Sequence, residues 1–319
     1  MQHRILDISE EAVWLKTSLK RLVLSRMDKP DISLPFSDLA VLVVAHPRVT
    51  YTQSVLTGLV QAGGVFVTCD AKRHPTGMLL PLTGHSIQTE RFAKQAAASK
   101  PTQKRLWQQI VRNKIAGQAE VLKTLTGSDA GLSALIGNVR SGDPTNVEAV
   151  SARKYWPALF GPSFRRIQQQ QESEFDSDDS SVSDETIRFI QNRWLNYGYA
   201  VLRAMTARAI CAAGLHPSLG LHHHSRYNAY CLADDLMEPF RPLIDLAVAE
   251  HLSDMSADLW DLNRTAKERL LNSLTGRCVL RGERRSIFDV LTRVATSLCS
   301  VYCGESTSLE IPETLNATF

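Results

Sequence analysis

The stretch GGVFVTCDAKRHPTGMLLPLTGHSIQTERFAKQAAASK, residues 63–100, decides the fold because the spacing of its apolar residues changes along it. VFVTCD (65–70) is an apolar run typical of a buried strand, and a turn with one more strand follows it. From about Ile87 the period becomes 3.6, which indicates helices. The chain therefore changes here from strands to helices.

The sequence before this stretch predicts a β-rich unit. Short strands are expected at 4–8 and 39–45, and residues 12–26 have the pattern of a hairpin broken near Ser18. One helix is expected between them and the 65–70 strand. Thr50 or Thr52 can cap it, it runs to about Gln61, and Gly63–Gly64 ends it.

The sequence after this stretch predicts helices. Pro101 stands where a long helix begins, and its apolar stripe is Leu106, Ile110, Ile115 and Val121. Further helices are expected at about 129–139, 145–160, 184–213, 234–252, 265–275 and 286–303. The predicted fold is α+β, with a small N-terminal β-rich domain (1–86) and a larger all-α catalytic domain (87–319).

Composition places the chain among ordinary globular proteins. It has 319 residues, 44% of them hydrophobic and 22% charged. No apolar run reaches the roughly 18 residues of a membrane span, and the N-terminal residues lack a signal-peptide core. The six cysteines are scattered, as expected for buried, reduced thiols. We therefore expect a cytoplasmic location.

The charge is unevenly distributed. The net charge is +3, but residues 171–187 contain seven acids and no Lys or Arg, which leaves 36 basic and 26 acidic residues elsewhere. This excess suits a polyanionic partner, with a solvated surface of mixed charge as the alternative. Residues 168–185 are too polar to be buried and predict a mobile acidic loop. It is either a plain linker or an element that gates a site or mimics DNA.

Glu148 is the first candidate metal ligand. It lies on a predicted helix that Thr145 or Asn146 can cap, and Tyr155 shares its face. A half-buried glutamate needs a partner, which can be an arginine or a cation.

The second candidate segment is GLHPSLGLHHHSRYNAYCLADDLMEPFRP, residues 214–242. A Gly- and Pro-rich loop leads into three histidines, and Asp235 and Glu238 then share one face of a helix that Pro239 breaks or kinks. Separately, each feature can be a solvated turn or a charged helix face. Together with Glu148 they indicate a site for Mg²⁺ or Mn²⁺, because carboxylates and imidazole favour such cations.

These segments also carry a family resemblance. DPTNVEAVSARKYWPALFG (143–161), residues 192–245, KRLWQQIVRNKIAGQ (104–118) and residues 63–82 are similar to the CRISPR-associated endonuclease/integrase family, the catalytic subunit of the spacer-acquisition complex. The resemblance covers essentially the whole chain and is strongest to versions from type II systems.

The resemblance implies a site and a reaction. It implies Glu148, His223 and Glu238 as catalytic metal ligands, with Asp235 as an additional or outer member. His222, His224 and Asp234 are adjacent alternatives. The implied reaction joins prespacer 3′-OH ends into the CRISPR repeat by transesterification, with DNA endonuclease activity from the same site. A stand-alone metal-dependent nuclease and an inactive DNA-binding scaffold are the alternatives.

The resemblance also implies partners. The N-terminal domain would form a homodimer, and two dimers would bridge a dimer of the second universal CRISPR-associated acquisition protein in a hetero-hexamer. The type II effector nuclease is a further candidate partner. Duplex DNA would be bound near the metal residues by Arg153, Lys154, Arg165, Arg166, Arg226, Tyr155 and Tyr227. Structural roles are an equal alternative for the two tyrosines. Lys104, Arg105, Arg112 and Lys114 form a second candidate DNA face, or a solvated helix face.

Overall fold

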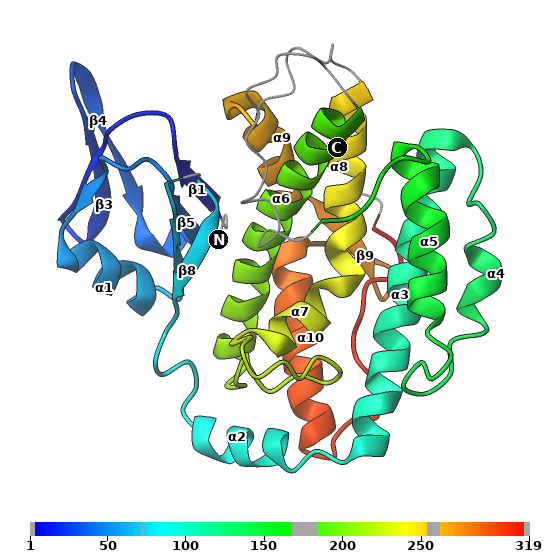
Figure 1. Ribbon diagram of the computed structural model, residues 1–319. Helices are drawn as coiled ribbons and strands as arrows, with labels where there is room; N and C mark the ends of the chain where they lie inside the picture. The colour runs from blue at the N-terminus through cyan, green and yellow to red at the C-terminus, as the bar shows by residue number, and fades with distance from the viewer. Residues whose placement is uncertain (1–3, 72, 168–183, 254–261, 316–319) are drawn as a thin grey trace.

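The computed structural model describes residues 4–71, 73–167, 184–253 and 262–315. Figure 1 shows strands gathered at the left and a larger helical body at the right. The predicted acidic loop lies outside the described residues, except that Asp184 and Glu185 begin a helix. A β-sheet region followed by a mainly helical region confirms the predicted fold class.

The β region contains two sheets. The first has the order β1 (Arg4–Ile8), β5 (Leu39–Val44), β7 (Val65–Cys69) and β8 (Pro75–Leu79), with the first three strands parallel. The second has the order β4 (Lys29–Pro35), β3 (Arg21–Arg26), β2 (Trp14–Ser18) and β6 (Thr50–Tyr51). Helix α1 (Gln53–Gln61) connects β6 to β7. The predicted hairpin with its break near Ser18 is therefore confirmed as β2 and β3.

Strand β5 is buried on both faces, as its continuous apolar run predicts. Its alternate residues belong to two cores, since successive side chains of a strand point to opposite faces. Val41 and Val43 pack with the helical core, whereas Leu42 and Val44 pack with residues of the second sheet. The first sheet is thus the middle layer between the second sheet and the helices.

Helices form the second region. Their bounds are α2 Gln88–Ala96, α3 Lys100–Thr126, α4 Ser133–Ile136, α5 Val147–Phe160, α6 Asp184–Ala212, α7 Cys231–Met237, α8 Arg241–Ser253, α9 Arg264–Thr275 and α10 Ile287–Tyr302. Ser99 caps α3, Pro101 lies in its first turn, and left-handed Gly127 follows its end. All four predicted stripe residues of α3 are buried.

Three parts of the helical prediction need correction. A hairpin of β9 (Arg277–Leu280) and β10 (Glu283–Ser286) interrupts the region predicted to be all-helical. Its two-residue turn, Arg281–Gly282, has positive φ at both residues, as a tight hairpin requires. The helix predicted at 129–139 is only the short α4. The helix predicted at 234–252 is α7 and α8 with the 3₁₀ turn Glu238–Phe240 (η3) between them, because Pro239 cannot donate a helical hydrogen bond.

Helix α6 joins the two regions. It contacts β5, β7 and β8 on one side and α7, α8 and α10 on the other, and Figure 1 shows it beside the sheet. Tyr197 of α6 donates a 2.7 Å hydrogen bond to Asp7 of β1. Lys267 of α9 adds an ion pair to Asp7 at 3.7 Å.

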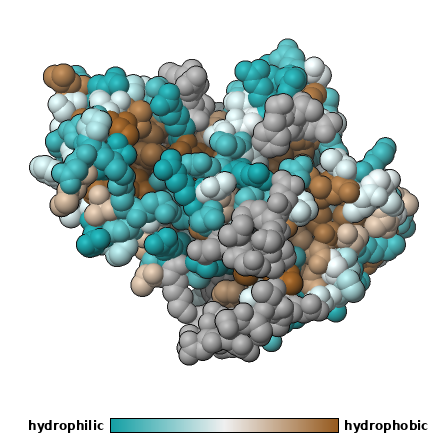
Figure 2. Space-filling view, turned by 90° about the horizontal axis from the view of Figure 1, so that it is seen from above, coloured by the Kyte–Doolittle hydropathy of each residue, from teal (hydrophilic) through white to brown (hydrophobic). Residues whose placement is uncertain are grey.

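The surface over the β region is partly apolar. Figure 2 shows brown apolar residues among the teal ones at the left of the view, where this region lies. The exposed apolar residues of the second sheet and its loops are Trp14, Leu19, Met27, Ile32 and Tyr51. Among the described residues, none of the helices is both long and apolar enough to cross a bilayer.

Candidate metal and nucleic-acid site

Glu148 is fixed in the first turn of α5 by two polar residues before it. Asn146 caps the helix by accepting a hydrogen bond from the backbone N–H of Ala149. Asp143 accepts from the N–H groups of Val147 at 2.9 Å and Glu148 at 3.0 Å. The helix start predicted from Thr145 or Asn146 is confirmed, with Asn146 as the cap.

Glu238 lies in the turn between α7 and α8 and is only 3% exposed. Its Oε1 atom is 3.1 Å from the guanidinium of Arg241, one turn further on. Burial raises the pKa of such a carboxyl, but Arg241 and Lys114 outweigh this effect and the pKa of Glu238 is lowered. Glu238 therefore carries a buried negative charge that needs cations near it.

The two glutamates converge on Lys114 of α3. Its ammonium nitrogen is 2.5 Å from Glu148 Oε1 and 2.6 Å from Glu238 Oε2. The Lys114 side chain is 12% exposed. Burial acts against its charge, but the two carboxylates outweigh burial and the pKa of Lys114 is raised. Residues from α3, α5 and η3 thus form one charged cluster.

The histidine segment is held by Asp235, which is fully buried. Its Oδ2 accepts from the N–H groups of Leu221 at 2.6 Å and His222 at 3.0 Å, and its Oδ1 lies 2.6 Å from His223 Nδ1. This hydrogen bond raises the pKa of His223. Because Asp235 engages Nδ1, the other ring nitrogen, Nε2, is the one left for a metal or a proton.

Gly220 permits this tight loop. A Cβ at this position would lie 2.3 Å from the carbonyl oxygen of His223 and 2.9 Å from Asp235 Oδ2. A side chain there would push the loop away from Asp235.

The structure separates the three consecutive histidines. The His222 ring stacks on Trp107 with a centroid distance of 4.2 Å, and burial lowers its pKa. His224 instead lines a surface pocket together with Ser218 and Gly220. Of the three, only His223 has a ring bonded to Asp235, and its pKa responds to the charge of Glu238.

Asp234 is engaged elsewhere. Its carboxylate accepts hydrogen bonds from Arg203 Nε at 2.6 Å and Asn228 Nδ2 at 2.7 Å. Asp234 therefore holds the loop before α7 to α6, and its neighbour Asp235 is the acid that supports His223.

The predicted metal ligands lie together, but not as a formed metal cage. Across the described residues, no group of three His, Cys, Asp or Glu side chains has the arrangement to hold a metal ion. Lys114 lies between the two glutamates, and His223 is bonded to Asp235. The buried Oε2 of Glu238 makes no hydrogen bond within the described part of the chain, although it is in ion-pair contact with Lys114. Two carboxylates that share one cation, with an imidazole beside them, are ligand types suited to a hard divalent ion.

A buried hydrogen-bond network supports this cluster from behind. Tyr155 of α5 donates a 2.9 Å hydrogen bond to Asp245 of α8, and Tyr199 of α6 donates to the same carboxylate. Burial raises the pKa of Asp245 to about 6. Tyr155 is 0% exposed, so its side chain is not available to contact DNA, and the structural alternative applies to it. Tyr155 packs in the helical core instead.

The predicted DNA-binding arginines and lysines divide into two groups. Arg153, Lys154, Arg165 and Arg226 are exposed, as is Tyr227. Arg166 instead points inward: its guanidinium donates to Asn192 at 2.8 Å and lies over the Tyr199 ring. It holds the chain after α5 against α6.

The second predicted DNA face, on α3, is also divided. Lys104 and Arg105 are exposed. Arg112 is exposed as well, although its guanidinium donates to the carbonyl of Val139 at 2.9 Å, whereas Lys114 is engaged by the glutamates. The interpretation of all four as one solvated or DNA-binding face is therefore wrong for Lys114.

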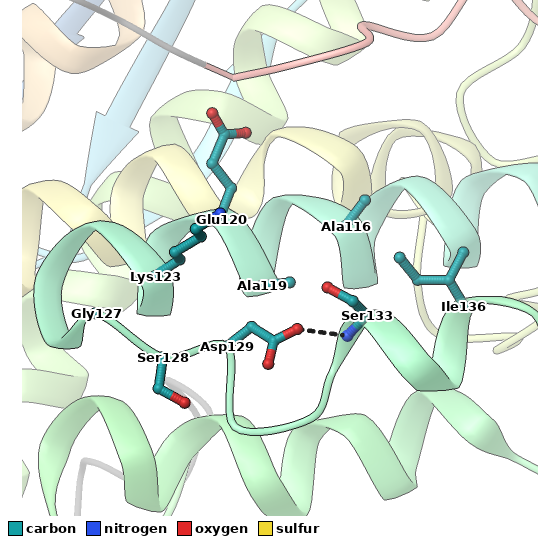
Figure 3. Close-up of a pocket in the computed structure, with 9 residues that line it drawn as sticks. All are labelled: Ala116, Ala119, Glu120, Lys123, Gly127, Ser128, Asp129, Ser133 and Ile136. Atoms are coloured by element: carbon teal, nitrogen blue, oxygen red, sulfur yellow. Dashed lines mark hydrogen bonds between the residues drawn. The ribbon is translucent and has the colours of Figure 1, made fainter.

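A surface pocket of about 630 Å³ opens on the side of α3 away from Lys114. Figure 3 shows α3 beside the loop before α4, where Asp129 accepts a hydrogen bond from the Ser133 backbone N–H at 3.1 Å. None of the residues that line this pocket is a predicted site residue. The lining consists of Ala116, Ala119, Glu120, Lys123, Gly127, Ser128, Asp129, Ser133 and Ile136.

Sequence reasoning missed Lys114 and Arg241 as members of the charged cluster. A signal was present for Lys114, which follows the buried Ile110 by four residues and so lies on the apolar face of α3. A lysine on such a face requires an acidic partner. Gln95 of α2, which fixes the histidine loop through His216 and Leu219, had no comparable signal.

Comparisons with known proteins agree on one family. The family model of the CRISPR associated protein Cas1 matches residues 6–282. The CRISPR-associated endonuclease Cas1 of Neisseria meningitidis serogroup C is 34% identical over 300 residues, covering 93% of this chain and 92% of that protein.

Solved structures have the same fold. A casposase bound to integration product has a TM-score of 0.74 at 18% identity and covers 96% of this chain and 92% of its own. A Cas6-RT-Cas1–Cas2 complex has a TM-score of 0.69 at 17% identity and covers 100% of this chain and 36% of that chain. At these identities the likeness shows the fold alone.

Proposed function

Because the chain belongs to the Cas1 family of CRISPR-associated proteins, we propose that it is a metal-dependent DNA integrase of CRISPR adaptation. It joins the 3′-OH ends of a prespacer duplex to phosphodiester bonds of the repeat by transesterification. DNA endonuclease activity arises from the same site. The observation that carries the proposal is the convergence of Glu148 and Glu238 beside His223 from three separate elements.

Glu148, Glu238 and His223 would hold Mg²⁺ or Mn²⁺, and Asp235 would act as the outer member. When bound, such an ion polarises a phosphoryl oxygen and lowers the pKa of an attacking hydroxyl. The protein's own contribution is to hold these ligand side chains in place. Asp235 holds His223 by Nδ1 so that Nε2 is free to bind, and Asp143 holds the first turn that carries Glu148.

DNA binding is assigned to the exposed basic side chains in and beside the two segments that carry the predicted ligands. Arg153 and Lys154 follow Glu148 on the outer side of α5, and Arg226 follows the histidines beside exposed Tyr227. Arg165 lies just after α5. Such side chains neutralise phosphates and position a duplex without reading its sequence.

The proposed assembly is a homodimer formed through residues 1–86, of which two copies bridge a dimer of the second universal acquisition protein. The exposed apolar residues of the second sheet are suited to an interface. The solved structure of a Cas6-RT-Cas1–Cas2 complex contains a chain of similar fold, which supports the choice of partner. On the resemblance of its motifs, we assign the chain to a type II system in the prokaryotic cytoplasm, with the effector nuclease as a further partner. A repeat array and an effector gene beside this gene would test that assignment.

The function is tested by strand joining. The protein and its partner are incubated with Mn²⁺, a repeat plasmid and a duplex with 3′-OH or 3′-deoxy ends. We expect joining only with 3′-OH ends, and loss of joining with retained DNA binding in Glu148→Ala and His223→Ala. His224→Ala and Glu90→Ala are the matched controls and should remain active.

Other outcomes identify the alternatives. Cleavage without joining for both duplexes would make the protein a stand-alone nuclease. DNA binding without any reaction in Mg²⁺ or Mn²⁺ would make it a scaffold. Full activity of both site variants would overturn the site assignment.

A further inference from the structure

We propose that Lys114 is a built-in counter-cation for the two site glutamates, and that a divalent ion binds there by displacing the Lys114 ammonium group. This inference rests on the metal site of the proposed function and assigns a positioning role to a residue outside its ligand set. The ammonium group would hold Glu148 and Glu238 together in the metal-free protein and withdraw when the ion enters.

The first support is the position of Lys114. Its nitrogen is within 2.6 Å of oxygens from both glutamates, which come from elements about 90 residues apart in sequence. The side chain is 12% exposed, so water cannot solvate these charges fully. Without Lys114, two carboxylates would face each other in a poorly solvated place and would repel each other.

The second support is charge balance. Glu148 and Glu238 carry two negative charges, and Lys114 and Arg241 supply two positive ones. A divalent ion at the same carboxylates would add two charges close to an ammonium group, and like charges at such distances repel strongly outside bulk water. The ion and the ammonium group therefore compete for the same oxygens.

The third support identifies Lys114 rather than Arg241 as the group that leaves. Arg241 packs over the Tyr199 ring with its guanidinium carbon 4.8 Å from the centroid, besides its ion pair with Glu238. Lys114 ends in a compact group on a flexible four-carbon stem. Its partner Glu148 is 26% exposed, so solvent reaches this side of the cluster.

The test measures Mn²⁺ binding by calorimetry, and thermal unfolding with and without Mn²⁺, in the full-length protein. In Lys114→Met we expect lower stability without metal, Mn²⁺ affinity higher by about tenfold or more, and a larger Mn²⁺-induced rise in Tm than in the unsubstituted protein. Lys114→Arg retains the charge and should retain weak binding. Lys123→Met, at an exposed position of the same helix, should change neither quantity.

A second measurement needs no substitution. Reductive methylation of the native protein, followed by mass spectrometry, reports how accessible each lysine amine is. Modification of Lys114 should increase several-fold when Mn²⁺ is added, whereas modification of Lys123 should stay constant. This experiment decides the question even if Lys114→Met does not fold.

The outcomes separate the two proposals. Unchanged or weaker Mn²⁺ affinity in Lys114→Met, or constant methylation of Lys114, overturns the role of Lys114 while the metal site stands if Glu148→Ala abolishes binding. Absence of Mn²⁺ binding in both the unsubstituted protein and Lys114→Met overturns the metal site and the inference together.

Discussion

Tyr155 donates a 2.9 Å hydrogen bond to Asp245, and this bond joins the helix that carries Glu148 to the helix that follows Glu238. Tyr155→Phe would remove the hydroxyl donor and leave one oxygen of the buried Asp245 carboxylate without this hydrogen bond. We expect a loss of about 1–3 kcal/mol in the free energy of unfolding, measured by urea denaturation.

Tyr227→Phe is the control for this substitution, because its side chain is 83% exposed and should change stability by less than about 0.5 kcal/mol. Equal stability of Tyr155→Phe and the unsubstituted protein would show that the bond contributes nothing to holding the two helices together.

The same carboxylate predicts a dependence of stability on pH. Burial raises the pKa of Asp245 from 3.8 to about 6, so the folded protein binds its proton more tightly than the unfolded chain does. The contribution of Asp245 to the free energy of unfolding is therefore most favourable below about pH 4. It falls by about 3 kcal/mol in all as the pH rises through 6. Asp245→Asn cannot titrate.

The free energies of unfolding of both proteins should therefore be compared between pH 4 and pH 7. The free energy of unfolding of the unsubstituted protein, relative to that of Asp245→Asn, should decrease from pH 4 to pH 7. A constant difference would mean that Asp245 does not keep its proton in the folded state.

Asp235→Asn should loosen the histidine segment. The carboxylate accepts hydrogen bonds from the backbone of Leu221, His222 and His223, and an amide would turn an N–H group toward these donors. We expect a loss of about 2–4 kcal/mol by chemical denaturation. Asp31→Asn, half exposed in a surface ion pair, should cost less than about 1 kcal/mol. Similar values for the two variants would refute the anchoring role of Asp235.

Gln95→Leu should release the preceding part of the same loop. The buried carboxamide donates to the carbonyls of His216 and Leu219, both at 3.0 Å, and accepts from the His216 N–H at 2.8 Å. Leucine of similar size would leave these groups unpaired at a cost of about 2–4 kcal/mol. Hydrogen exchange should accelerate at residues 215–223. Exposed Glu90→Ala, on the same helix, should leave that exchange unchanged.

The fold could be predicted from the sequence wherever apolar spacing is unambiguous. Leu39–Val44 and the stripe of α3 have periods that only one kind of element satisfies. The β9–β10 hairpin was missed because its four-residue strands are too short for a period, and the Arg281–Gly282 turn is not one of the common hairpin pairs.

The candidate site could be predicted only as a list of residue types. Carboxylates and histidines in two segments indicated the chemistry, but not that Lys114 would lie between Glu148 and Glu238. That position depends on how α3 packs against α5 and η3, which no local pattern contains. For the same reason Tyr155 and Arg166 seemed available to DNA, although packing buries one and turns the other inward.

Helix α6 is an unbroken element of 29 residues that contacts the sheet on one side and α7 and α8 on the other. A continuous hydrogen-bonded helix bends little, so a displacement of the β region is transmitted along it instead of being absorbed. Helix α6 therefore couples the position of the β region to the positions of α7 and α8. In the proposed homodimer, the spacing of the two β regions would therefore set where the two copies of the candidate site stand along a bound DNA duplex.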